Sequence, residues 1–410
     1  MATDVAPHPD VAGDQQPAPP AAGMSRRSAL KGLGVGGATV LVAGSGVLSY
    51  RVFDNGVLDA GAGKPYDAWS HWRNDPGVLG AVGAAILAAN PHNTQPWLFH
   101  VTASSVALFA DPTRQMAAMD PLRREHHVGL GCALENLTQA LTARGYRPDV
   151  TVLPTPGDQT LLAQVALTRG PASSSALHDA IGARHSNRGP YQPKPVPQPV
   201  LAALAGLAGG LPGVAVRWLT SDTDGAALGA LIIAATEAII GDAGQSKEAF
   251  AWFRNNRDDI VKHRDGLTLD GQGLDAVTLT LAKLLPASSR TAGDAFWLKQ
   301  TRTVHTATAA AYGVITVADP DDVATRLDGG RLLQRIHLAA TAGGLGLQHM
   351  NQITERIDRE RDQQLPATFA PRLQDLLGQP GRRPLVSFRV GYPVRAALRS
   401  PRRPLSAVTR

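Results

Sequence analysis

The sequence predicts an α+β protein in which two related halves of one chain each build an antiparallel-rich sheet flanked by helices. Short strand-like runs of apolar residues alternate with helical periodicity along residues 75–393. A small-residue helical stretch, Ala133–Tyr146, also aligns without a gap on Leu333–Leu345. Two apolar helices can match by chance, which is the alternative to a duplication. A duplication would place the halves at roughly residues 70–170 and 175–395.

The first half is expected to begin with a helix. Asp75 and Pro76 favour a helix start, because Asp is a common N-cap and Pro fits the first helical position. Apolar residues then follow a helical period from Val78 to Ile86, and Pro91 ends it. The later elements of this half are the strands LFHV and SVALFAD after Trp97, expected as a hairpin, a buried helix at Gly129–Tyr146, and strands at Asp149–Leu153 and Leu161–Leu167.

The second half is expected to be less regular. Its predicted helices are Leu177–Ala183, Pro199–Ala208, Asp224–Ile240 and Arg331–Gly343, and its predicted strands are Val214–Leu219, Gly313–Ala318 and Leu385–Val390. Residues 241–300 carry scattered aromatic side chains without a clear period. We therefore expect irregular structure there and interpret it as a candidate lid.

The charge of the chain is concentrated at its end. The stretch Arg395–Arg410 holds five Arg and no acid, against a formal net charge of +6. We interpret residues 396–410 as a solvated, mobile basic tail; contact with a membrane surface or nucleic acid is the sharper alternative. No aromatic-interleaved basic patch and no zinc-finger spacing occurs in the sequence, so no nucleic-acid partner is expected.

Thiol and metal chemistry have little support in the sequence. Cys132 is the only cysteine, so the chain cannot form an internal disulfide or a cysteine-based metal site. The pair His126–His127 stands at an expected helix start and is interpreted as solvated or core. The sequence has no His-Glu-x-x-His and no Gly-x-Ser-x-Gly motif. No metal ligand and no catalytic side chain is assigned.

The first 63 residues predict export. Residues 1–23 carry five Pro and no Lys or Arg, which is typical of a disordered prefix. Residues 24–63 resemble a twin-arginine signal: Arg26 and Arg27 precede an uncharged run, Gly32–Tyr50, that would span ~28 Å as a helix. The run contains a formal Gly-x-Gly-x-x-Gly match, which we reject because no strand precedes it. The expected partner is the twin-arginine translocase. The protein would be extracytoplasmic after cleavage near Asp59–Gly63, or would remain membrane-anchored.

Four motifs together resemble the FMN-dependent nitroreductase family. The stretch ARHSNRGPY (183–191) resembles its Arg-x-Ser-x-Arg signature, and NPHNTQPWLF (90–99) resembles its Asn-x-Gln-Pro-Trp run. GGRLLQRIHLAATAGGLGL (329–347) resembles its central helix, and SFRVGYP (387–393) its terminal strand. In that family two chains share each FMN. Here each signature occurs once, so the resemblance implies a nitroreductase fold in a fused dimer with one flavin site, as in the Acg-like subgroup, and a monomer acting as an intramolecular dimer.

The resemblance assigns cofactor-binding residues. Arg184, Ser186 and Arg389 match the family's phosphate group, and Arg188 matches the cation near N1 and O2 of the ring. The chemistry is consistent, because Arg binds phosphate in a bidentate manner and a cation stabilises the negative charge of a reduced flavin. For RHSNR alone, a solvated charged turn is the alternative.

Two further groups complete the assignment. Asn90, Asn93 and Gln95 can cover the pyrimidine edge of a flavin, because amide side chains both donate and accept hydrogen bonds. A helix end followed by a turn is the alternative for these residues. Gly344 and Asn351 fall where the family places backbone near N5, and a helix end with a loop is again the alternative.

The resemblance implies an oxidoreductase. NAD(P)H would reduce bound FMN, and a small-molecule acceptor such as a nitroaromatic or a quinone would then be reduced at the same ring. The rival is a protein that sequesters FMN with little turnover. The physiological acceptor, the electron donor outside the cytoplasm, and the true start codon do not follow from the sequence.

Export can be tested with the arginine pair. Substitution of Lys at both Arg26 and Arg27 should trap the protein in the cytoplasm, because the translocase recognises that pair. Fractionation of cells that express either form measures this. Equal export of the double variant would contradict the twin-arginine interpretation.

Overall fold

The computed structural model describes residues 56–220 and 222–410. The prefix at residues 1–23, the Arg26–Arg27 pair and the Gly-rich run after it lie outside the described residues. The contacts separate the chain into two units, Met1–Tyr50 and Arg51–Arg410. All described residues lie in the second unit. Its mixture of helices and antiparallel sheets confirms the predicted α+β class.

The first sheet belongs to the N-terminal part of the chain. Its strands lie in the order β1-β2-β4-β3, and all neighbours are antiparallel. Trp97 pairs with Ala110 across the β1–β2 hairpin, as predicted. Trp97 and Phe99 are fully buried, so one face of the sheet supports the core. The strands are β1 (Trp97–Val101), β2 (Ser105–Ala110), β3 (Tyr146–Val152) and β4 (Leu161–Arg169).

The second sheet has the same plan. Its order is β5-β8-β10-β9, again with antiparallel neighbours, so matching positions are filled by strands in the same chain order. In each sheet a helix connects the second strand to an edge strand. The strands are β5 (Ala215–Leu219), β8 (Ala311–Val317), β9 (Gly346–His349) and β10 (Arg383–Gly391). The sequence analysis did not predict β9.

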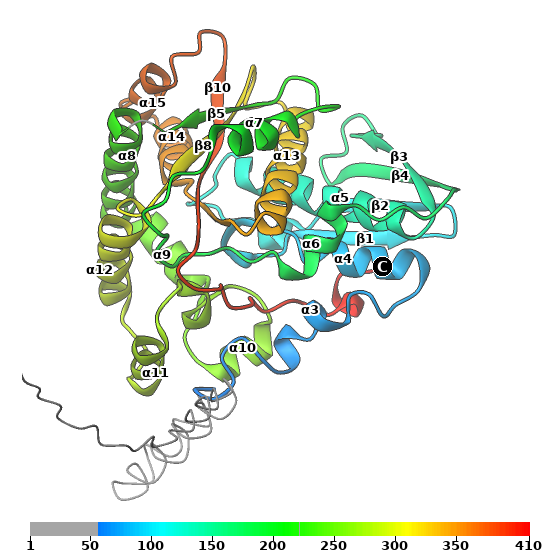
Figure 1. Cartoon of the computed structure of the whole chain (residues 1–410), viewed down its shortest axis with the longest axis horizontal. Helices are drawn as coiled ribbons and strands as arrows, with labels where there is room; N and C mark the ends of the chain where they lie inside the picture. The colour runs from blue at the N-terminus through cyan, green and yellow to red at the C-terminus, as the bar shows by residue number, and fades with distance from the viewer. Residues whose placement is uncertain (1–55, 221) are drawn as a thin grey trace, which may run out of the picture. The chain divides into compact units, whose positions relative to one another are not determined.

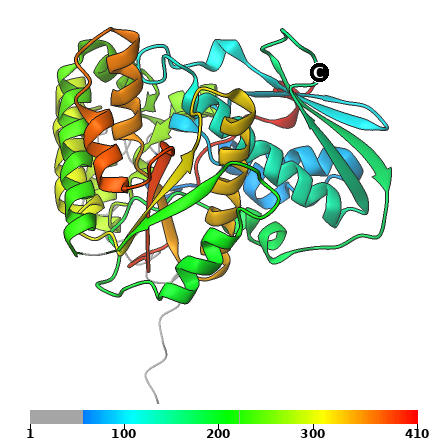
Figure 2. The same ribbon diagram turned by 90° about the horizontal axis from the view of Figure 1, so that it is seen from above.

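The two connecting helices, α5 (Arg124–Ala143) and α13 (Val323–Ala342), cross at close range. Figures 1 and 2 show them side by side between the two sheets. A Cβ at Gly131 would lie 2.1 Å from the Leu327 carbonyl oxygen, and one at Gly330 would lie 2.1 Å from the Val128 oxygen. Glycine at both positions therefore lets the two backbones touch. This crossing joins the parts of the chain that hold the two sheets.

Residues 241–300 are not irregular, and that prediction was wrong. They form four helices and a two-stranded parallel sheet. Each helix has a side-chain N-cap: Asp242, Asn256, Asp275 and Ser289 each accept a hydrogen bond from a backbone amide in the first turn. The elements are α9 (Ala243–Ala251), β6 (Phe253–Arg254), α10 (Arg257–His263), β7 (Leu267–Thr268), α11 (Ala276–Leu284) and α12 (Arg290–Gln300).

The basic tail at residues 396–410 is not a solvated end, and that prediction was also wrong. Val408 is fully buried, and Arg402 is 3% exposed. The Arg410 amide donates to the Phe99 carbonyl at 2.9 Å, and Thr409 bridges to Phe99, so the last residues run along the edge of β1. The tail is part of the folded unit.

The remaining helices cover the sheets. They are α3 (Ala68–His71), α4 (Gly77–Ala85), α6 (Ala176–Ala180), α7 (Gln198–Gly206), α8 (Asp222–Gly241), α14 (Gln352–Asp362) and α15 (Phe369–Leu377). Helix α4 starts one residue later than Asp75 and Pro76 suggested, with Pro76 as its N-cap. Helix α8 is long and apolar enough to cross a membrane by composition, which is weak evidence, because Leu228 and Ile232 on its inner face are buried in a core cluster.

The helix crossing generates a stability prediction. Gly330→Ala should lower the free energy of unfolding by about 2 kcal/mol or more, because the new methyl group overlaps the Val128 carbonyl and forces the helices apart. Gly225→Ala in α8 is the matched control, since no atom lies within 4 Å of the added methyl group. The control should be neutral or stabilising by up to about 1 kcal/mol. Urea denaturation measures both, and equal effects would contradict the close crossing.

Candidate functional site

A pocket forms where four separate segments of the chain meet. Its walls come from residues 89–93, from the connection 184–188, from the loop 266–271 and from the tail at 398–402. The space inside it, including space that is open to solvent, is about 490 Å³.

The turn after α4 has an unusual backbone. His92, Asn93 and Gln95 have φ values of 45°, 55° and 53°, in the left-handed region that non-glycine residues rarely adopt. The Asn90 carboxamide oxygen accepts the Gln95 amide at 2.8 Å and holds the turn closed. Asn90 and Asn93 line the pocket, whereas Gln95 does not.

Asn93 fastens two other walls of the pocket. Its Nδ2 donates to the carbonyl oxygens of Gly266 at 3.1 Å and Pro401 at 3.0 Å, and its Oδ1 accepts from Arg402 at 2.7 Å. The Asn93 carbonyl in turn accepts the Gly266 amide. One side chain thus joins the turn, the 266–271 loop and the tail.

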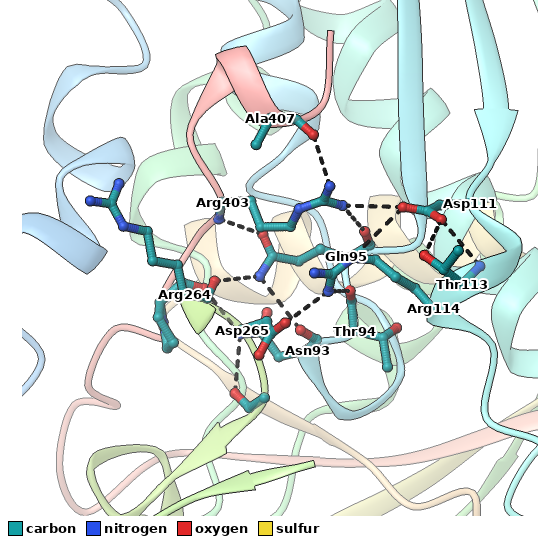
Figure 3. A network of polar contacts seen from close by, with 12 residues as sticks. Asn93, Thr94, Gln95, Asp111, Thr113, Arg114, Arg264, Asp265, Arg403 and Ala407 are labelled. Carbon is teal, nitrogen blue, oxygen red and sulfur yellow. Dashed lines mark hydrogen bonds and ion pairs between the residues drawn. The ribbon is translucent and has the colours of Figure 1, made fainter. Parts of the chain in front are cut away.

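Gln95 makes similar bonds one layer further from the pocket. Figure 3 shows its amide between two segments: Nε2 donates to the Arg264 carbonyl at 2.8 Å, and Oε1 accepts the Arg403 amide at 2.8 Å. The neighbouring Asp265 pairs with Arg114 at 2.8 Å. In this geometry the polar atoms of Gln95 bind the chain itself, so its assignment to a flavin edge stays a prediction.

Three arginines line the pocket, and no Asp or Glu lines it. Arg184 and Arg402 are 2% and 3% exposed, and both donate to the Leu87 carbonyl. Arg188 donates to the Gly271 carbonyl at 3.0 Å. Within the described residues none of the three forms a salt bridge with a carboxylate, and the Nε atoms of Arg184 and Arg402 have no hydrogen-bond partner.

Burial of these cations is costly. It lowers the pKa of Arg184 and of Arg188 to about 10. Burial, and then the adjacent charge of Arg184, lowers the pKa of Arg402 well below its ordinary value. A buried charge normally requires an opposite charge beside it. The pocket therefore has the chemistry of a site that binds an anion.

Histidines surround the same arginines. Burial, followed by the charge of Arg184, lowers the pKa of His185 and of His349 to about 3. Arg184 Nη1 donates to Nδ1 of His337 at 3.2 Å, and burial lowers the pKa of His337 strongly as well. These rings are therefore neutral near pH 7 and do not offset or add to the charge of the arginines.

The remaining phosphate candidates occupy different positions. Ser186 lines the pocket and forms a β-bridge with Leu347. Arg389 is fully buried but lies outside the lining. Its guanidinium donates to the Gly189 carbonyl at 2.7 Å and to the Gln348 side chain at 2.8 Å. Arg389 therefore holds the connection 184–191 in place through Gly189 and does not line the pocket.

Gly344 and Asn351 lie away from the pocket lining. Gly344 follows α13 with φ 74° and is exposed, which is typical of a helix end. Asn351 stands at the N-cap position of α14 without a side-chain cap, and its side chain accepts the Ser387 amide at 3.1 Å. Their predicted role near N5 has no support in this geometry and stays a prediction.

Much of the pocket lining was not predicted from the sequence. Arg402 was placed in a solvated tail, yet it supplies one of the three pocket arginines. The pocket residues that the sequence did not suggest are Ala89, His185, Gly266, Leu267, Thr268, Gly271, Leu398, Ser400 and Arg402. Residues 266–271 and 398–402 are distant in sequence from both motifs, so only the tertiary structure brings them to the site. The described residues contain no group of three or more His, Cys, Asp or Glu that could hold a metal ion.

Comparisons with known proteins point in one direction. No family model matches the chain. A curated Mycobacterium tuberculosis protein named "Putative NAD(P)H nitroreductase Rv3131" is 32% identical over 141 residues, which cover 34% of this chain and 41% of that protein. A second, "Putative NAD(P)H nitroreductase acg", is 31% identical over 121 residues, which cover 29% of this chain and 37% of that protein. The chain thus aligns with less than half the length of each relative.

Solved structures give distant matches. The FMN and NADPH-dependent nitroreductase NfnB from a Sphingopyxis strain matches 57% of this chain and 97% of its own, at 18% identity and a TM-score of 0.37. A Desulfitobacterium hafniense nitroreductase with bound FMN matches 57% of this chain and 95% of its own, at 15% identity and a TM-score of 0.34.

A carboxyl pair near Asn351 generates a pH prediction. Burial raises the pKa of Glu355 from 4.5 to about 8, and burial followed by the charge of Glu355 raises that of Glu125. The folded state therefore holds a proton that the unfolded chain releases above its ordinary pKa. That stabilisation is complete below about pH 4.5 and is lost as the pH rises through about 8.

Glu355→Gln should accordingly flatten the fall of the free energy of unfolding between pH 5 and 8, by up to ~1.4 kcal/mol per pH unit, and so also flatten the fall of the melting temperature. The control is Glu237→Gln, at a partly exposed ion pair with Arg302. Thermal unfolding across this pH range measures both. An unchanged slope in Glu355→Gln would show that the pair is ionised in the folded protein.

Proposed function

We propose that this chain is an FMN-binding oxidoreductase of the nitroreductase type. The observation that carries the proposal is the anion-seeking pocket, which joins the turn of the Asn-x-Gln-Pro-Trp motif to the Arg-x-Ser-x-Arg motif. The partial similarity to curated NAD(P)H nitroreductases agrees with it. Both signatures of the resemblance thus contribute to one site, although they lie almost a hundred residues apart.

The residues of the pocket fit the phosphate of FMN. A phosphate dianion between Arg184 and Arg402 would neutralise the two like charges and provide acceptors for their unpaired Nε atoms. The Ser186 hydroxyl, also in the lining, can donate to a phosphate oxygen. This assignment retains Arg184 and Ser186 as phosphate contacts, as predicted from the sequence. It places Arg402, instead of Arg389, in direct contact with the phosphate.

The other polar lining residues remain for the rest of the cofactor. Bound FMN would supply hydride and electron transfer, which no side chain of the pocket can perform. Arg188 provides a fixed positive charge whose position is set by the Gly271 carbonyl. Asn90 presents an amide at the same wall, while Asn93 holds the loop and the tail in place. No protein acid or base is assigned.

The repeated architecture supports an intramolecular dimer. Both sheets have the same strand order, and their connecting helices α5 and α13 cross through paired glycines. In the nitroreductase family, FMN lies where two such units meet. Here the two motifs occur once each, so we propose one flavin per chain and a monomer.

The proposed substrates follow the family resemblance. NAD(P)H would be the electron donor, and a nitroaromatic, a quinone or a related small molecule would be the acceptor. We propose export through the twin-arginine route, with the protein extracytoplasmic or membrane-anchored. Under that localisation a quinol or a partner reductase is the alternative donor, because NADPH is scarce outside the cytoplasm.

The phosphate assignment can be tested by comparing FMN with riboflavin, which lacks the phosphate. Arg184→Gln and Arg402→Gln should each weaken FMN binding by roughly 10- to 100-fold, the loss of one charge-assisted contact, and should leave riboflavin binding nearly unchanged. Arg217→Gln, at an exposed position of β5, is the matched control. Flavin fluorescence titration measures all four proteins. Equal losses for FMN and riboflavin would refute the phosphate contact.

Turnover separates the enzyme from a sequestering protein. The FMN-loaded protein is mixed with NADPH without oxygen, and the flavin absorbance is followed. Bleaching within seconds supports the oxidoreductase. A flavin that stays yellow with NADPH and with a reduced quinone analogue would favour sequestration.

A further inference from the structure

Helix α11 (Ala276–Leu284) exposes apolar side chains and buries its only charged one. Its outer face carries Val277 and Leu281, and Leu285 directly follows the helix; these side chains are 70%, 56% and 63% exposed. Their spacing of four residues places them along one stripe. On the opposite side Leu279 and Lys283 are buried, and Lys283 pairs with Asp270 at 2.6 Å. The only charge of the helix therefore points inward, and its apolar residues point outward.

More exposed apolar residues lie in the neighbouring segments. Among the described residues, nine large apolar side chains are exposed, and five of them belong to α11 and the residue after it, to α10 and to residue 58. Polar contacts join these segments: Lys283 donates to the Gly56 carbonyl at 3.0 Å, and Arg257 of α10 pairs with Asp59 at 3.3 Å. Figure 1 shows α10 and α11 at the same end of the unit. These five residues form the exposed apolar patch: Leu58, Val261, Val277, Leu281 and Leu285.

A second protein is a poor occupant for this surface. A nine-residue helix is ~14 Å long. Stable interfaces between proteins bury about 1,200–2,000 Å² in total, which three or four aliphatic side chains cannot provide. Aliphatic side chains without surrounding aromatic or arginine anchors are also atypical of a binding hot spot. A bilayer surface has no such size requirement, because each inserted aliphatic group contributes separately.

The position of the patch in the chain favours the bilayer. The uncharged run Gly32–Tyr50 ends six residues before Gly56, a distance of at most ~21 Å of extended chain. Residues after Gly56 are tied into the fold: the Gly61 amide donates to buried Asp270 at 2.9 Å, and Tyr66 is buried. Cleavage at Asp59–Gly63 would break these contacts, so the structure favours a retained N-terminal segment.

We propose that the outer face of α11, with Leu58 and Val261, rests on the surface of a lipid bilayer. Val277, Leu281 and Leu285 enter the interfacial region. The loop 266–271, which precedes α11, lines the pocket. The contact would therefore hold the pocket close to the membrane, where lipid-soluble small molecules gather. This proposal does not depend on the identity of the bound cofactor.

The test places an environment-sensitive probe on the full-length protein in phosphatidylglycerol–phosphatidylcholine vesicles. Leu281→Cys is labelled with a nitrobenzoxadiazole fluorophore. The native Cys132 is fully buried and burial raises the pKa of its thiol to about 12, so it stays unlabelled. Leu365→Cys, at a position 46% exposed and outside the patch, is the matched control.

The proposal predicts a blue-shifted emission at position 281 and at least a twofold stronger quenching by nitroxide-labelled lipids there than at position 365. Similar quenching at both positions would overturn it. A blue shift at position 281 without lipid quenching would also overturn it, because the probe would then be covered by protein, such as a second copy of this chain. Water-like emission at position 281 would show that the stripe faces solvent.

Discussion

The chemistry of the pocket depends on two buried guanidinium groups, those of Arg184 and Arg402. Both contact the same carbonyl group, and neither has a carboxylate beside it in the described part of the chain. Both guanidinium groups donate to Leu87, and each keeps an unpaired Nε. Two like charges at this separation repel each other, and burial removes the water that would screen them. Such an arrangement favours the binding of an anion, because an anion would neutralise both charges and accept hydrogen bonds from the unpaired Nε atoms. The anion-binding chemistry of the pocket follows from this one constraint.

The fold brings distant parts of the chain together to place these two arginines. The crossing of α5 and α13 aligns the two sheets, so that the turn after α4 lies beside the connection 184–188. Asn93 then fastens the 266–271 loop and the tail to that turn. The left-handed backbone of His92, Asn93 and Gln95 is energetically unfavourable, and the surrounding hydrogen bonds hold this conformation in place. Strained backbone and unpaired cations in one place are typical of a functional site.

Local patterns predicted much of the scaffold. The β1–β2 hairpin and the small-residue helix α5 followed from periodicity, because one face of each is buried. The helices at 241–300 were not predicted, although each begins with a side-chain cap such as Asp242 or Ser289, because the aromatic residues of this stretch follow no clear helical period. The edge strand β9 has only four residues and gives almost no periodic signal. Five of the residues assigned from the sequence, Asn90, Asn93, Arg184, Ser186 and Arg188, line one pocket, and their role in binding a flavin stays a prediction. Arg402 could not be predicted, since a run of arginines near a terminus is indistinguishable in sequence from a solvated tail.

The most direct test of the central claim is the flavin content of the purified protein. Heat releases bound FMN, and its fluorescence relative to the protein concentration gives the number of flavins per chain, before and after incubation with excess FMN. The account predicts a value near one, with the released flavin phosphorylated. A protein that is colourless and remains so after incubation with FMN would contradict it.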